Sequence, residues 1–114
     1  MITVRITQEH GEPVGFHVSG HAERGAYGND LVCAAVSAIV QTAILGVTEE
    51  LRLNAGVSIH EGETICILER DVPQADAEKA AIVINTMVRG LKAIQAAYPH
   101  TIQFLKKEIQ PCSR

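Results

Sequence analysis

An uncharged, strongly apolar run from Leu31 to Thr48 restricts the possible folds of this 114-residue chain more than any other feature. The run reaches the length of a membrane span, but it contains Ser37 and Gln41 and lies between segments with strand periodicity. We therefore expect a buried core helix, and no association with a membrane. Because the N-terminus lacks the basic-then-apolar pattern of a signal peptide, we also expect a cytoplasmic protein.

Apolar and polar residues alternate on both sides of this run, which is the pattern of half-buried strands. The alternation covers residues 2–7 and 14–19, with a turn at Gly11 and Pro13, and predicts an antiparallel hairpin. Residues 56–60 and 64–69 flank Glu61-Gly62 and predict a second hairpin.

A second helix is predicted after Pro73, because proline is tolerated in the first turn of a helix. Its apolar face has spacings of three and four: Ala80, Ile84, Met87, Leu91, Ile94 and Tyr98. Pro99 ends this helix, and residues 101–109 have the character of a last strand. The order ββαββαβ predicts one α/β domain of the α+β type over residues 1–114, with a mainly antiparallel sheet and two helices packed on one face.

Composition narrows the function classes. Hydrophobic residues make up 46% of the chain, so a real core is expected, and the net charge is −3 with scattered basic residues. We therefore predict no direct nucleic-acid binding. The three cysteines are an odd number without CxxC spacing, which indicates free thiols in a reducing compartment.

The segment before the apolar helix carries the candidate chemistry. Residues 20–29 contain three glycines and are expected to form a loop, with Asn29 or Asp30 capping a helix that runs to about Leu53. Cys33 would then lie in the first helical turn, where unpaired N–H groups and the helix dipole stabilise a thiolate relative to a thiol. The same N–H groups could stabilise the oxyanion formed when the thiolate attacks an amide.

His21 is the candidate general base for Cys33, because a hairpin strand and a helix joined by a short loop can bring their near ends together. Asp30 either orients His21 or caps the helix, and we favour the cap. The loop could close over a peptide as a lid. The candidate substrate-loop residues are Gly20, Ala22, Gly25, Gly28 and Ser37.

Other interpretations of these residues stay open from the sequence alone. A cysteine in the run VCAAV is more often a small buried hydrophobe than a nucleophile. A glycine loop before a helix could bind an anion, although the Lys-Ser/Thr ending of a P-loop is missing. His17, His21 and Cys33 match no zinc spacing, so we predict no metal and no cofactor. Cys66 is expected in the core and Cys112 in an exposed tail.

The same stretch resembles a known family. Its characteristic residues are Gly20-His21-Ala22, then Gly28, Asp30 and the run Val32-Cys33-Ala34-Ala35-Val36-Ser37. This joined motif resembles that of the ribosomal-processing cysteine proteases, the Prp family, and the element order agrees over essentially the whole chain.

The resemblance implies a homodimer with a catalytic dyad at Cys33 and His21, and matches Asp30 to an acidic position of the family. It implies a ribosomal protein precursor as the substrate: the N-terminal extension of a bacterial large-subunit protein, cut next to an aromatic residue. The alternative is a non-catalytic, dimeric, ribosome-associated interaction module that uses the apolar helix as a dimer core.

Overall fold

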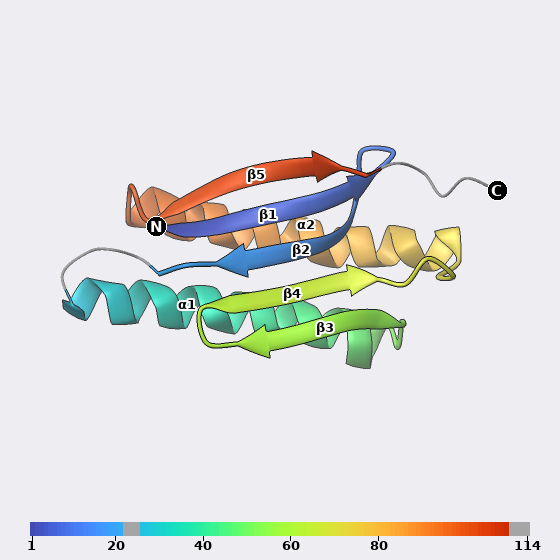
Figure 1. Ribbon diagram of the computed structural model, residues 1–114, viewed down its shortest axis with the longest axis horizontal. Helices are drawn as coiled ribbons and strands as arrows, with labels where there is room; N and C mark the ends of the chain where they lie inside the picture. The colour runs from blue at the N-terminus through green and yellow to red at the C-terminus, as the bar shows by residue number, and fades with distance from the viewer. Residues whose placement is uncertain (22–25, 110–114) are drawn as a thin grey trace.

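The structure, a computed structural model, describes residues 1–21 and 26–109, and over residues 26–30 it describes the backbone. The elements follow in the order β1 (Ile2–Glu9), β2 (Glu12–Ser19), α1 (Ala26–Leu45), a π-helical segment (Gly46–Glu50), β3 (Ala55–His60), β4 (Glu63–Leu68), α2 (Gln74–Ala97) and β5 (Ile102–Glu108). Figure 1 shows a two-layer arrangement, with one sheet and both helices on the same face of it. The predicted fold class and element order are confirmed.

The sheet has the strand order β3-β4-β2-β1-β5. Three of its four strand pairs are antiparallel, and β1 pairs with β5 in parallel. Both predicted hairpins are present. The first one turns at His10 and Gly11, whose φ values of 55° and 76° are typical of the two-residue turns that match strand twist.

The core lies between the sheet and the two helices, where the alternating strand residues and the helix faces meet. Ile2, Val4 and Ile6 of β1 are at most 5% exposed, as their period of two predicts. The face of α2 predicted to be apolar is also buried at Ala80, Ile84, Met87 and Leu91. Local periodicity therefore placed these side chains on the correct faces.

The first helix differs from the prediction at both ends. It begins at Ala26, so Asn29 and Asp30 lie inside α1 and neither is its cap. After Leu45 the backbone widens into the π-helical segment, where the Leu51 N–H donates to the Gly46 carbonyl at 2.9 Å. The α-helix is thus shifted toward the N-terminus relative to the predicted residues 30–53.

The apolar run of α1 is buried along one stripe only. Its buried side chains are Val32, Val36, Val40, Ala43 and Ile44. Leu31 and Leu45 are 48% and 56% exposed, so the expected buried core helix is only partly buried within a single chain. By length and composition alone, residues 31–50 could span a membrane, but the core helices of soluble proteins pass the same test. The share of this helix that is buried inside the protein is 33%.

Candidate active site

Gly20 directly follows β2 and directs the chain toward α1. Its φ is +92°, a conformation that side-chain-bearing residues rarely adopt, and a Cβ there would lie 2.5 Å from the Met1 carbonyl oxygen. Its N–H donates to the carbonyl of Gly62 at 3.0 Å. This bond ties the end of β2 to the β3–β4 turn. His21, the next residue, is exposed beside that turn.

Cys33 lies on α1 at the border between the core and solvent. It is half-buried, packs against the core, and follows the fully buried Val32. Because α1 begins at Ala26, Cys33 is not in the first turn, and only the first four N–H groups of a helix lack an intrahelical partner. The expected thiolate stabilisation and oxyanion binding by first-turn N–H groups therefore do not apply to Cys33.

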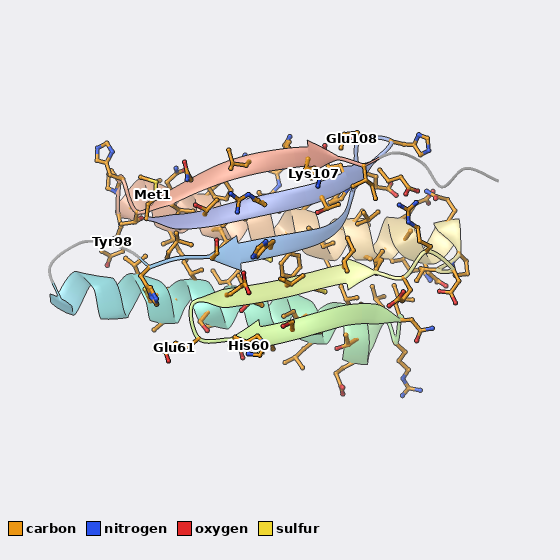
Figure 2. All side chains as sticks on the ribbon, viewed as in Figure 1. Met1, His60, Glu61, Tyr98, Lys107 and Glu108 are labelled. Atoms are coloured by element: carbon orange, nitrogen blue, oxygen red, sulfur yellow. The ribbon has the colours of Figure 1, made fainter. Side chains whose placement is uncertain are left out.

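One cavity of about 490 Å³ brings Cys33 and His21 together between α1, the end of β2 and the β3–β4 hairpin. Its apolar wall is made of Ile2, Val18, Val36, Val40 and Ile59. Its polar side carries His60, Glu61, Glu63, Thr64, Ser37 and Gln41. Figure 2 shows His60 and Glu61 at the β3–β4 turn, beside the ribbon of α1. A thiol, an imidazole and an apolar wall in one open cavity suit attack on a peptide bond next to an apolar side chain.

Among the predicted substrate-loop residues, the structure describes Gly20, Ser37 and the backbone of Gly28. Gly20 and Ser37 line the cavity. Ser37 belongs to α1 rather than to a loop, and its Oγ accepts a hydrogen bond from Gln41 Nε2 at 3.0 Å. Gly28 was also expected in the loop and instead lies in α1.

The remaining predictions fall outside what the structure describes. Ala22 and Gly25 belong to residues 22–25, and the role of Asp30 depends on a side chain that is not described. Cys112 likewise lies beyond the described residues, at 110–114. Of these, only the backbone of Asp30, inside α1, can be compared with the prediction.

The β3–β4 turn is the part of the site that the sequence did not indicate. Glu61 and Gly62 were predicted only as the turn of a hairpin, and His60 as the end of the strand before it. In the structure, residues His60 to Glu63 all line the cavity. Glu63 faces β2 as well, where its Oε2 lies 2.9 Å from His17 Nε2. Strands β2 and β4 pair so that Ser19 lies opposite Glu63. This register places the β3–β4 turn next to the end of β2. No local pattern encodes that pairing.

Cys66 provides a contrast to Cys33. It is 2% exposed in β4, and burial raises the pKa of its thiol to about 11. The prediction that Cys66 is a core residue is confirmed. Within the described residues, no group of three or more His, Cys, Asp or Glu side chains is arranged to hold a metal ion.

Comparison with known proteins identifies the family. The model of the cysteine protease Prp family matches residues 1–103. The chain belongs to the Prp family of cysteine proteases. The ribosomal processing cysteine protease Prp of Staphylococcus aureus is 33% identical over 107 residues, which cover 90% of this chain and 96% of that protein. The resemblance found in the sequence is thereby confirmed.

Solved structures support the same assignment to Prp. The S. aureus protease Prp with a covalently linked product peptide superimposes with a TM-score of 0.77 at 26% identity, covering 94% of this chain and all of that one. A Streptococcus mutans protein has a TM-score of 0.78 at 21% identity, with 96% of both chains covered, and shows the shared fold. The cysteine-containing cavity therefore lies in a fold that is shared with a cysteine protease.

Proposed function

We propose that this Prp-family protein is a cysteine endopeptidase that removes the N-terminal extension of a bacterial large-subunit ribosomal protein, with Cys33 as nucleophile and His21 as general base and acid. The observation that carries the proposal is the single cavity lined by both side chains. The name of the S. aureus relative, a ribosomal processing protease, supports the substrate class.

The proposed reaction has two steps. His21 takes the Cys33 proton, the thiolate sulfur attacks the scissile carbonyl carbon, and a C–S bond forms. The imidazolium then gives its proton to the leaving amine as the C–N bond breaks, which leaves a thioester on Cys33. In the second step His21 takes a proton from water, and the oxygen of that water attacks the thioester carbonyl carbon to form a C–O bond. The C–S bond then breaks, the imidazolium returns its proton to the Cys33 sulfur, and the new acid is released and loses its proton to solvent.

Ser37 is the proposed donor to the oxyanion of both steps. It follows Cys33 by four residues on α1, so the two side chains lie on the same helix face, and both line the cavity. Since Gln41 Nε2 donates to Ser37 Oγ, the oxygen acts as acceptor there, and its own O–H is left to donate to the developing charge. This assignment replaces the first-turn N–H groups expected from the sequence.

The apolar wall of the cavity is the proposed binding place of the side chain next to the scissile bond. Its most exposed apolar member is Ile59, at 49%, whereas Ile2, Val18 and Val40 are at most 8% exposed. An aromatic side chain gains the most from such a wall, because it buries a large apolar area. This agrees with the aromatic residue that the resemblance implies at the cleavage site.

The direct test is incubation of the protein with an N-terminally extended ribosomal protein, followed by mass spectrometry of the new N-terminus. We expect cleavage next to an aromatic residue, no cleavage by Cys33→Ala, and a loss of at least about 100-fold for His21→Ala. Cys112→Ser is the matched cysteine control and should cleave normally. Undiminished cleavage by a folded Cys33→Ala protein would refute the proposal.

We also propose that the exposed stripe of α1 forms a homodimer interface. The stripe runs along the helix through Leu31, Ala34, Ala38 and Leu45. Small and apolar residues at spacings of three, four and seven are typical of a helix face that packs against another helix. Sedimentation equilibrium should give a dimer for the native protein and a monomer for Leu45→Glu; a monomeric native protein would contradict this interface.

A cytoplasmic location is the last element of the proposal. Among the described residues, Cys33 and Cys66 are both free thiols, as a reducing compartment requires. Cell fractionation should place the protein in the soluble fraction with the ribosomes, whereas recovery in the membrane fraction would contradict the proposal.

A further inference from the structure

We propose that Gly62, in the β3–β4 turn, is a positioning residue for His21, because the missing side chain at position 62 fixes where the imidazole can lie. The inference rests on the proposed function, in which His21 is the general base. It assigns a part in catalysis to a turn that the sequence predicted only as a connection between two strands.

The contact between the turn and the imidazole is close. A Cβ placed on Gly62 would lie 3.2 Å from His21 Nε2 and 3.6 Å from Cε1. The first of these distances is tighter than normal packing, so any side chain at position 62 would displace the imidazole by a few tenths of an ångström. The absence of a side chain at Gly62 therefore leaves open the space beside the ring.

A hydrogen bond between backbone groups joins the two segments that carry His21 and Gly62. The Gly20 N–H donates to the Gly62 carbonyl at 3.0 Å, so the residue before His21 is bound to the same turn. Figure 1 shows the β3–β4 turn at the same end of the sheet as the end of β2. Gly62 therefore limits the position of the imidazole and also holds the backbone just before it.

Such support matters because His21 is exposed. An exposed side chain samples several rotamers, and each one that is unproductive lowers the fraction of time in which the base can reach its target. The turn closes one side of the space available to the ring. Since a misplacement of about 1 Å can cost about 100-fold in rate, a few tenths should cost about three- to tenfold.

The chain provides a matched control at Gly11. Gly11 is the second residue of the other two-residue hairpin turn, its φ of +76° is close to the +79° of Gly62, and a Cβ there would meet nothing within 4 Å. Gly62→Ala and Gly11→Ala therefore impose the same backbone strain, but only the first one touches His21. Asparagine tolerates positive φ better than alanine, yet it has the same Cβ. Gly62→Asn thus separates strain from contact.

The experiment measures kcat and KM for peptide cleavage together with the ¹H–¹³C spectrum of the His21 imidazole. For Gly62→Ala and Gly62→Asn we expect kcat to fall about three- to tenfold with KM within twofold, and the His21 Cε1–H signal to shift. The matched controls, the Gly11 variants Gly11→Ala and Gly11→Asn, should behave like the native protein in both measurements, and thermal unfolding shows which variants are folded.

Several results would overturn the inference. These are a native kcat in folded Gly62→Ala, recovery of kcat in Gly62→Asn, or an equal loss in the Gly11 variants. The spectrum needs no substrate, so an unmoved His21 signal overturns the contact by itself. Cleavage by native protein that does not depend on Cys33 would instead show that the proposed function had failed.

Discussion

Burial of Cys66 should make the stability of the protein fall at alkaline pH. The pKa of this thiol rises from an ordinary value of 9.0 to about 11 because the folded protein desolvates the thiolate. Below pH 9 both the folded and unfolded states keep the proton, and the contribution to stability is fully present. As pH rises toward 11 the unfolded state loses its proton while the folded state keeps it, so the free energy of unfolding falls.

The magnitude follows from the difference between the two pKa values. Each pKa unit corresponds to about 1.4 kcal/mol, so the loss between pH 9 and 11 should be about 2–3 kcal/mol. Urea unfolding at several pH values between 8 and 11 measures it, under reducing conditions. Other groups also titrate in this range, so Cys66→Ala serves as the reference. Its cavity costs stability at every pH and leaves the pH dependence of the remaining groups unchanged.

The quantity to compare is the difference between the two unfolding curves. The advantage of the native protein over Cys66→Ala should shrink by about 2–3 kcal/mol as pH rises from 9 to 11. A constant difference across this range would refute the reasoning, because it would mean that the thiol ionises equally in both states. The same burial distinguishes Cys66 from Cys33, which borders the cavity and is the thiol available to a peptide.

Two further predictions concern the site. Ser37→Ala should lower kcat by about 10–100-fold with little change in KM, because it removes the proposed oxyanion donor. A native kcat in this variant would show that Ser37 is not the oxyanion donor. Gly20→Ala should lower the free energy of unfolding by at least about 2 kcal/mol, because its Cβ would meet the Met1 carbonyl oxygen at 2.5 Å and its φ is positive. Chemical denaturation measures this loss, and native stability would contradict the close approach.

The sequence determined the elements whose signals are local. A period of two in residues 2–7 and a period near 3.6 from Ala80 to Leu91 separate the core face from the solvent face, so both elements were predicted correctly. The proposed nucleophile was a different case. Alone, Cys33 was better explained as a buried hydrophobe, and only the joined motif around it favoured a peptidase.

The start of α1 shows where local rules fail. Asp30 is a favourable cap and Gly28 disfavours a helix, yet α1 begins at Ala26. Propensities of about 1 kcal/mol per residue are weak compared with tertiary packing, which supplies most helical stability in proteins. Because α1 begins at Ala26, Cys33 has no first-turn N–H groups beside it, and Ser37, one turn further along the same face, is the proposed oxyanion donor.

The cavity itself was decided by the tertiary structure. His21 and Cys33 are close in sequence, but Gly62 and its turn come from a hairpin that follows α1 along the chain. The hairpin reaches His21 because β4 pairs with β2 in a register that sets Ser19 opposite Glu63. Strand order and register depend on how whole faces bury against two helices, and this is a property of the assembled core. The sequence by itself therefore predicted a nucleophile and a base, whereas the position of the β3–β4 turn beside His21 emerged only from the fold.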